Sequence, residues 1–361
     1  MDSYDRLRER LDAHPTGAPA SSYFNQILRI LFSQEEAEAA CYLTFVFQPI
    51  SKLAEKTRKK EETLFEMFER MANRGVIMAK RASNGEPRYC LVPVIPGLFE
   101  FPFMRAERAP QKEELARLWQ AYHTEILGNT FAGSKTPQMR VIPVQKSLTM
   151  ISEVLIYEQV ADMIGRAQDI AVTNCACRES VQGCDKPIEV CLSFDMGARF
   201  LVERDLARKI DKEEALRVLD IAEEAGLVHC INNSQDRPIV LCNCCGCCCT
   251  ILRGITELHN PNAVATSSYM INFNENECSG CLLCLDNRCP VSAVQEKEDT
   301  VSVDESSCIG CGLCASVCPT GALVMRKREE TPTTPPTYQQ LYANIMQEKG
   351  TLEAFMKLNR E

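Results

Sequence analysis

The residues of this sequence that could do chemistry are its cysteines. There are 21 of them among 361 residues, and nineteen lie between Cys175 and Cys318. Only four histidines are present, so imidazole cannot be the main ligand type. An odd number of cysteines argues against complete disulfide pairing, and clustered thiolates outside a small secreted domain more often bind metal or do redox chemistry. Sulfur is therefore the ligand around which any functional site is built.

Two runs of cysteines share one spacing, C-x2-C-x2-C followed by a Cys-Pro step. The first run contains Cys278, Cys281, Cys284 and Cys289, and the second contains Cys308, Cys311, Cys314 and Cys318. The residues before each run also recur thirty positions apart, which indicates two half-domains related by an internal repeat. In the first run the third and fourth cysteines are separated by one residue more than in the second, so we expect a longer loop there.

The two runs resemble the bacterial two-cluster ferredoxin. In that family the fourth cysteine of each run ligates the cluster of the other run, so the resemblance implies two [4Fe-4S] clusters with crossed ligands. Cluster one would take Cys278, Cys281, Cys284 and Cys318, and cluster two would take Cys308, Cys311, Cys314 and Cys289. The alternative of two zinc sites is disfavoured, because zinc motifs do not normally repeat as four-cysteine runs that end in proline.

A second cysteine-rich region precedes these runs. It contains ten candidate metal ligands: Cys175, Cys177, Cys184, Cys191, Cys242, Cys244, Cys245, Cys247, Cys248 and Cys249. Ten exceed the four that one cubane needs, so we expect one or two further iron-sulfur clusters, with a zinc site or buried free thiols as the alternative. The first four could form one set. Neighbours such as Cys244 and Cys245 point to opposite sides of an extended chain, so the segment 242–249 could supply ligands to two sites.

The stretch 142–324 is similar to ferredoxin-type proteins of anaerobes that carry the same CNCCGCCC block ahead of a ferredoxin motif, often behind a helical N-terminal domain. That resemblance implies the same iron-sulfur module in this chain, but it does not imply which reaction the protein takes part in. The Cys244-Cys245-Gly246 core is also similar to the cysteine motif of heterodisulfide reductases, which hold non-cubane clusters and cleave disulfides. Cys230 could join either upstream site, and we expect Cys41 and Cys90 to be core residues.

The elements that must position these cysteines indicate an α+β fold. Residues 1–100 predict a winged-helix-like docking domain, with helices over 23–31, 35–44, 50–58 and 61–74 and a hairpin of strands 76–81 and 88–92. In a DNA-binding winged helix the last of these helices would enter the major groove. Here it carries Glu61, Glu62, Glu66 and Glu69, which argues against nucleic-acid binding and favours docking.

The remaining chain divides by composition. Residues 101–150 predict a connector with a helix over 111–127, residues 151–268 the cysteine-rich cluster-binding domain, and residues 269–328 the ferredoxin domain. Within 151–268 we expect a helix over 152–167, a strand over 170–173, and a helix from the Asp211 cap to Gly226 with Leu216, Leu219 and Ile221 on its apolar face. Residues 329–361 predict a Pro/Thr linker and one amphipathic C-terminal helix, which could cover the chain's own core or a partner.

These features lead to three functional hypotheses. The net charge of −9 would repel nucleic acid, and without a long apolar run we expect no membrane span and a cytoplasmic protein. The first hypothesis is an electron-transfer protein or subunit that relays low-potential electrons between a ferredoxin or flavoprotein and a larger anaerobic oxidoreductase. The second is an oxidoreductase with an open-site or non-cubane cluster that acts on a thiol, thioester or disulfide. The third is a redox-responsive DNA-binding regulator.

Overall fold

The structure, a computed structural model, describes residues 2–105, 110–148 and 159–360. Its α-helices are α1 (Ser3–Asp12), α2 (Ser22–Leu31), α3 (Gln34–Ala40), α4 (Ile50–Thr57), α5 (Glu61–Asn73), α6 (Phe101–Met104), α7 (Pro110–Tyr122), α8 (Gly128–Phe131), α9 (Val160–Arg166), α10 (Ala176–Val181), α11 (Asp195–Glu203), α12 (Lys212–Glu224), α13 (Arg253–Thr256), α14 (Tyr338–Lys349) and α15 (Leu352–Arg360). Its strands are β1 (Gln48–Pro49), β2 (Ile77–Arg81), β3 (Pro87–Leu91), β4 (Met139–Ile142), β5 (Ile170–Asn174), β6 (Glu189–Phe194), β7 (Arg208–Ile210), β8 (Val228–Asn232), β9 (Val240–Cys244), β10 (Tyr269–Phe273), β11 (Val294–Lys297), β12 (Thr300–Val303) and β13 (Leu323–Lys327).

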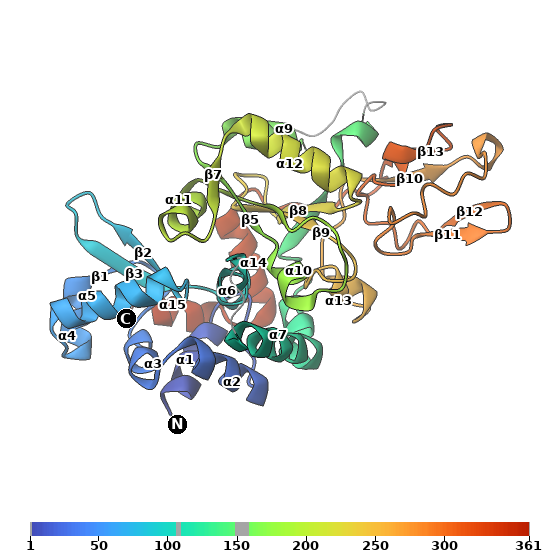
Figure 1. Cartoon of the computed structure of the whole chain (residues 1–361). Coiled ribbons are helices and arrows are strands. Elements are labelled where there is room, and N and C mark those ends of the chain that lie inside the picture. The colour runs from blue at the N-terminus through green and yellow to red at the C-terminus, as the bar shows by residue number, and fades with distance from the viewer. Residues whose placement is uncertain (1, 106–109, 149–158, 361) are drawn as a thin grey trace.

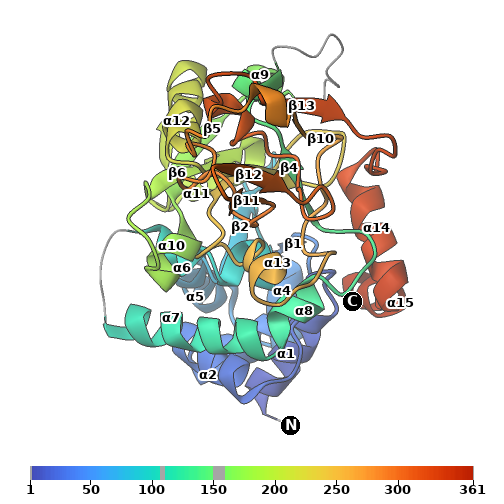
Figure 2. The same cartoon turned by 90° about the vertical axis from the view of Figure 1, so that its right-hand side faces the viewer.

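The mixture of helix and sheet is compatible with the α+β class. Figure 1 shows the arrangement: the N-terminal helices and the β2–β3 hairpin lie on one side, the sheet containing β5, β8 and β9 lies in the middle, and β10–β13 extend on the opposite side. In the view of Figure 2, the C-terminal helices α14 and α15 run along one flank of the molecule. The ferredoxin-like strands are therefore at the far end from the N-terminal helices.

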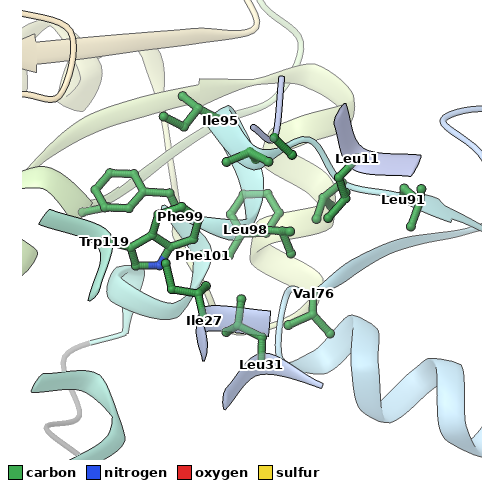
Figure 3. Packing of buried hydrophobic residues seen from close by; sticks show 14 of the residues in the cluster. Leu11, Ile27, Leu31, Val76, Leu91, Ile95, Leu98, Phe99, Phe101 and Trp119 are labelled. Carbon is green, nitrogen blue, oxygen red and sulfur yellow. The ribbon is translucent and has the colours of Figure 1, made fainter. Parts of the chain in front are cut away.

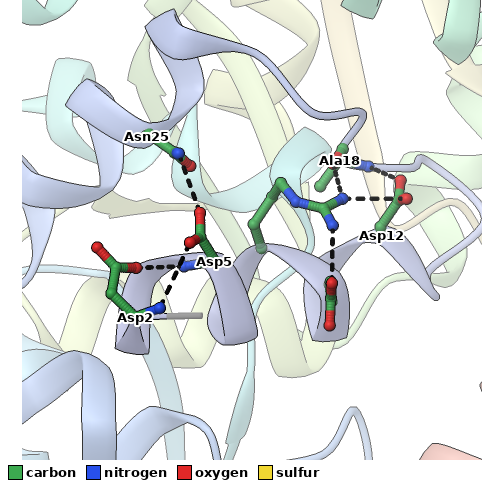
Figure 4. A network of polar contacts seen from close by, with 7 residues as sticks. Asp2, Asp5, Asp12, Ala18 and Asn25 are labelled. Atoms are coloured by element: carbon green, nitrogen blue, oxygen red, sulfur yellow. Dashed lines mark hydrogen bonds and ion pairs between the residues drawn. The ribbon is translucent and has the colours of Figure 1, made fainter.

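The N-terminal elements lie close to where the sequence predicts them. Helices α2, α3, α4 and α5 are followed by the β2–β3 hairpin, and helix α1 comes before them as an element that the sequence analysis did not include. Asp2 caps α1 by accepting the N–H of Asp5 at 2.9 Å, and the Asp5 carboxylate accepts the side-chain amide of Asn25 in α2 at 3.1 Å (Figure 4). These polar contacts fix the first helix against the second.

Helix α5, which would read DNA in a winged helix, uses part of its surface to contact the rest of the chain. The carboxylate of Glu69 accepts the hydroxyl of Tyr89 at 2.7 Å and pairs with Arg204 at 2.8 Å. Arg204 lies at the C-terminal end of α11, outside the N-terminal elements, and also donates to the side chain of Asn73 at 2.5 Å. This side of α5 is therefore occupied by the protein itself.

A single hydrophobic core joins the N-terminal helices to the central sheet. Leu11, Ile27, Leu98, Phe99 and Trp119 pack together in it (Figure 3). The same cluster continues to Val228, Cys230 and Cys244 on the strands and to Cys249 beyond them. Truncating a large buried aromatic residue in such a core costs about 3–5 kcal/mol, so this contact fixes the two parts relative to each other.

The central sheet has six antiparallel strands in the order β4-β8-β9-β6-β5-β7. Helices α9 and α12 cover one of its faces around a second hydrophobic cluster. Helix α12 is capped by Asp211, as predicted, but its predicted apolar face is partly wrong. Leu219 is buried, whereas Leu216 and Ile221 are exposed, because Ala215, Val218 and Ala222 face the sheet instead. Of the helix predicted over 152–167, residues 152–158 lie outside the described residues.

The ferredoxin-like strands pair between the two half-repeats. Strand β10, before the first cysteine run, pairs antiparallel with β13, after the second run. Strand β11, after the first run, pairs with β12, before the second. Each two-stranded sheet therefore takes one strand from each half, which is the arrangement that an internal repeat with crossed contributions requires.

The C-terminal segment forms two helices rather than one. Gly350 ends α14 in a left-handed conformation with φ of 70°, and α15 follows. Leu341 and Ile345 are buried, and the Lys349 ammonium group donates to the carbonyls of Pro15 and Thr130, so the segment packs on the chain's own core. Among the described residues, no helix has the length and apolar character that crossing a membrane requires.

Candidate metal centres

The eight cysteines of the two ferredoxin-like runs fall into two spatial groups. Burial raises the pKa of the Cys284 thiol, and the nearby thiolates of Cys281, Cys318 and Cys278 raise it further. Burial likewise raises the pKa of the Cys314 thiol, which has Cys311, Cys289 and Cys308 as its principal thiolate neighbours. Cys318 therefore lies with the first run and Cys289 lies with the second.

Backbone amides approach the sulfur atoms of the two crossed cysteines. The N–H groups of Ala293 and Val294 donate to Cys289 Sγ at 3.0 and 3.3 Å, and that of Leu323 donates to Cys318 Sγ at 3.4 Å. Val294 and Leu323 each stand five residues after their cysteine, so the two halves repeat this contact. Such N–H···S bonds stabilise thiolates and tune cluster potential, which fits iron-sulfur ligation.

The two groups differ in their distance from solvent. Cys281 of the first group is exposed, whereas Cys311 and Cys314 of the second group are buried. The second group lies against the rest of the chain, because the N–H of Val144 donates to the carbonyl of Cys311 at 2.9 Å. The second group therefore has more buried thiols than the first, in which only Cys284 is buried among the described residues.

Four of the ten upstream cysteines form a compact group that we call the four-thiol site: Cys184, Cys245, Cys247 and Cys248. Their sulfur atoms all lie within 4.8 Å of one another. Helix α10 ends at Gln182 in a left-handed conformation, and the next residue, Gly183, packs so closely that a Cβ there would lie 3.2 Å from Cys248 Sγ. This turn brings Cys184 to the loop that follows β9.

The other six upstream cysteines form what we call the six-thiol ring. Each thiol has two of the others as neighbours, in the order Cys175, Cys177, Cys249, Cys244, Cys242, Cys191 and back to Cys175. The sheet explains part of this arrangement. Cys242 and Cys244 alternate with Asn243 along β9 and so share a face, and Cys191 lies on the adjacent strand β6. Cys175 follows the end of β5 directly.

Asn243 points away from the ring and fixes the strand from its other face. Its side-chain oxygen lies 2.5 Å from His229 Nδ1, and its amide nitrogen donates to the carbonyl of Val190 at 2.5 Å. His229 Nε2 lies 3.2 Å from the carboxylate of Glu223 in α12. This buried polar network holds β9 in register and thereby sets the positions of the two flanking cysteines.

The six-thiol ring lines a cavity between the sheet and the segment that follows the β2–β3 hairpin. The cavity has a volume of about 80 Å³, and its wall includes Glu100, Met104 and Phe131. Burial raises the pKa of Glu100 to about 8, although its carboxylate accepts the N–H of Gly97 at 2.6 Å. A carboxyl group that can hold a proton near neutral pH therefore faces the ring.

Arg178 is buried beside both sets of thiols. Its Nη1 donates to the carbonyl of Asn243 at 2.8 Å and lies 3.9 Å from Cys245 Sγ of the four-thiol site. Burial alone would lower the pKa of Arg178, but the ring thiolates of Cys175 and Cys191 raise it. Within the described part of the chain, its Nε and Nη2 have no hydrogen-bond partner. A buried cation with free donors fits a site that holds anionic sulfur.

The crowded thiols shift one another's pKa values in both directions, and the pKa values of Cys244 and Cys247 rise to about 11. The hydrogen bond with the Cys248 thiol contributes most to lowering the pKa of Cys245 to about 4, and the positive charge of Arg178 lowers it further. A hydrogen bond with Cys175, and to a smaller extent one with Cys249, lowers the pKa of Cys177 well below its usual range. A metal ligand must be a thiolate, so both sets of thiols contain sulfur atoms that are ready to bind a cation.

The sequence expectations for this region are met only in part. Cys184 lies apart from Cys175, Cys177 and Cys191, with which it could have formed one set. Cys244 and Cys245 lie in different groups, since Cys244 neighbours Cys242 and Cys249 whereas Cys245 belongs to the four-thiol site. Cys230 lies beside Cys244, on the strand paired with β9. The sequence analysis did not identify Arg178 or Glu100, although Arg178 directly follows Cys177.

The cysteine-rich region touches the ferredoxin-like strands through tightly packed backbone. A Cβ on Gly246, between Cys245 and Cys247, would lie 2.3 Å from the carbonyl oxygen of Pro290, the residue after Cys289. Nearby, Arg288 Nη1 donates to the carbonyl of Glu223 at the end of α12 at 2.7 Å. The second ferredoxin-like group therefore borders the four-thiol site.

Comparison with known proteins supports the iron-sulfur assignment. The family model described as the 4Fe-4S binding domain matches residues 301–324, a stretch that contains Cys308, Cys311, Cys314 and Cys318. Neither the curated proteins nor the solved structures contain a match to this chain. The match and the cysteine groups together support an iron-sulfur protein with a role in electron transfer.

Proposed function

We propose that this chain is an electron-transfer protein or subunit that relays low-potential electrons between a ferredoxin or flavoprotein and a larger oxidoreductase of anaerobic metabolism. It would act in the cytoplasm. Two [4Fe-4S] clusters are held by the crossed cysteine sets, Cys278, Cys281, Cys284 and Cys318 for the first and Cys308, Cys311, Cys314 and Cys289 for the second. A further iron-sulfur cluster is held by the six-thiol ring.

The observation that carries this proposal is the continuous series of thiol groups from the surface to the interior. It starts at the exposed Cys281, continues to the group around the buried Cys314, and reaches the cysteine-rich region where Gly246 packs on Pro290. Electron transfer needs closely spaced carriers and no substrate pocket. A partner would exchange electrons at the exposed end, where Leu283 is also 49% exposed.

The test is an iron and acid-labile sulfide count on anaerobically purified full-length protein. Two ferredoxin clusters alone give about eight iron atoms, and one further cubane gives about twelve. We expect about twelve or more, with all clusters reduced by a low-potential ferredoxin. A count of eight would remove the cluster from the six-thiol ring, and failure of a reduced ferredoxin to transfer electrons would remove the relay function.

A second candidate function is an oxidoreductase whose ring-bound cluster acts on a small thiol, thioester or disulfide. The cavity favours it, because the ring faces enclosed space with Glu100 in the wall, where a carboxyl group could exchange a proton with a bound substrate. A change in the electron paramagnetic resonance (EPR) spectrum of the ring cluster on adding such compounds would support this function. If the spectrum does not change with any of these compounds, electron relay remains as the one proposed function.

A further inference from the structure

We propose that the four-thiol site holds a single tetrahedrally coordinated metal ion, zinc or iron, rather than an iron-sulfur cluster. This inference deepens the proposed function, since it decides which upstream cysteines belong to a cluster. The ligand set is Cys184, Cys245, Cys247 and Cys248, which leaves the six-thiol ring as the one cluster site of the cysteine-rich region.

The distances between the sulfur atoms carry the proposal. Cys184 Sγ lies 3.9 Å from Cys245 Sγ and 3.8 Å from Cys248 Sγ, and Cys247 Sγ lies 3.7 Å from Cys248 Sγ. Four sulfur atoms at about 2.3 Å from one ion form a tetrahedron whose edges measure about 3.8 Å. These three separations match the edge of that tetrahedron, and the other three pairs lie within 4.8 Å.

A cubane cluster needs a wider arrangement. Each of its four cysteines binds a different iron atom and points outward from the cluster, so the sulfur atoms stand further apart than around one ion. The spacing of the two ferredoxin-like sets is compatible with this wider arrangement. Among the described residues, the four-thiol site is the group whose sulfur atoms all lie within 4.8 Å of one another, and neither ferredoxin-like set forms such a group.

The surroundings of the site also suit one ion with four thiolates. Gly183 packs directly against the site, because a Cβ on it would lie 3.2 Å from Cys248 Sγ. A divalent ion with four thiolates carries a net charge of −2, and the guanidinium of Arg178 at 3.9 Å offsets part of it. Four protein ligands leave no open coordination position, which is the pattern of structural rather than catalytic sites.

The position of the ion gives it a structural task. Cys184 comes from the loop after α10, and the other three ligands come from the loop after β9, so the ion crosslinks two loops that are far apart in sequence. Gly246 lies inside the ligand loop and packs against Pro290. Fixing this loop thereby fixes the surface on which the second ferredoxin-like group rests.

The experiment compares metal and sulfide content in the full-length protein and in Cys247→Ala, with Cys90→Ala as a matched control. Cys90 is a buried cysteine of β3, outside both upstream thiol groups. We expect Cys247→Ala to lose about one zinc or iron atom per chain without loss of acid-labile sulfide, and Cys90→Ala to lose none. Loss of about four iron atoms with four sulfides would overturn the proposal, as would unchanged metal content.

A measurement on the wild-type protein keeps the proposal testable if Cys247→Ala does not fold. X-ray absorption at the zinc edge should show four sulfur ligands at about 2.3 Å, or the oxidised protein should show the spectrum of a ferric ion with four thiolates. Absence of both signals would overturn the proposal. Either result is separate from the relay function, because reduction of the ferredoxin clusters and their iron count do not depend on this ion.

Discussion

Arg178 is the residue through which the two upstream thiol groups are electrostatically linked. Its guanidinium lies 3.9 Å from Cys245 Sγ, and the thiolates of Cys175 and Cys191 raise its pKa. A buried positive charge stabilises the more negative, reduced form of a nearby cluster. Its removal should therefore make that cluster harder to reduce.

We expect Arg178→Gln to lower the reduction potential of the cluster proposed for the six-thiol ring by roughly 60 mV, a tenfold change for a one-electron couple. The exposed Arg217→Gln on α12 is the charge-matched control and should leave the potential unchanged. Redox titration followed by EPR measures both. An Arg178→Gln potential equal to that of the control would show that the guanidinium does not act on a cluster.

At the same scale, the sequence identified the cysteines but not how they divide. Three members of each ferredoxin-like set follow from spacing, because they come from one short loop, whereas the crossed fourth member follows from the resemblance to two-cluster ferredoxins. The upstream sets depend on which side of β9 each residue faces and on a left-handed turn at Gln182, which brings Cys184 to residues 61 to 64 positions later in the chain. Arg178 could have been noted, since an arginine next to a C-x-C pair is well placed to face sulfur.

Among the elements, the loop after β9 has little room for change, because Gly246 meets Pro290. A Cβ there would lie 2.3 Å from a backbone oxygen, and backbone cannot move as a flexible side chain can. Overpacking of this kind costs about 1–3 kcal/mol. Overpacking at Gly246 would weaken the contact between the cysteine-rich region and the ferredoxin-like strands.

We expect Gly246→Ala to lower the free energy of unfolding by this amount and to slow electron transfer between the clusters proposed for the ferredoxin-like sets and for the six-thiol ring. Gly197→Ala in α11 is the matched control, since its Cβ would meet nothing within 4 Å, and it should stabilise the protein by up to about 1 kcal/mol. Thermal unfolding and stopped-flow reduction measure the two effects. Equal behaviour of both variants would contradict this role for Gly246.

Element positions were more predictable than the faces they bury. Helices α2 to α5 and the β2–β3 hairpin follow from apolar spacing and turn residues, whereas the buried face of α12 does not. Small residues such as Ala215 and Ala222 let this helix approach the sheet, so close packing displaced the larger Leu216 and Ile221 to the surface. The sequence pattern gives hydrophobicity, but the fit between surfaces needs the fold.

In the whole molecule, the two ends of the chain meet around His14. Its ring packs at 4.7 Å from Phe45, 5.2 Å from Tyr342 and 6.2 Å from Phe355, and its Nδ1 accepts the N–H of Thr16 at 3.2 Å. Burial lowers the pKa of His14 to about 3, and the nearby charge of Lys349 adds to this shift. The folded protein therefore keeps this histidine neutral.

Between pH about 6.5 and about 3 the unfolded chain binds a proton at His14 that the folded chain does not. Stability should therefore fall as the pH falls through this window, at a rate of up to roughly 1.4 kcal/mol per pH unit from this group. We expect His14→Gln to show a smaller loss between pH 7 and pH 5 in anaerobic thermal unfolding. The exposed His259→Gln should follow the wild type. An unchanged slope in His14→Gln would contradict the assignment.

The segment 244–249 belongs to two sites at once, because Cys244 and Cys249 lie in the six-thiol ring while Cys245, Cys247 and Cys248 lie in the four-thiol site. On the proposed assignments, two kinds of metal cargo must be sorted within six residues of one loop. Cys245 directly follows a cluster ligand in sequence but belongs to the ion, so insertion at either site must leave the thiolates of the other site free. The loop therefore sets the specificity of maturation as well as the geometry of the two sites.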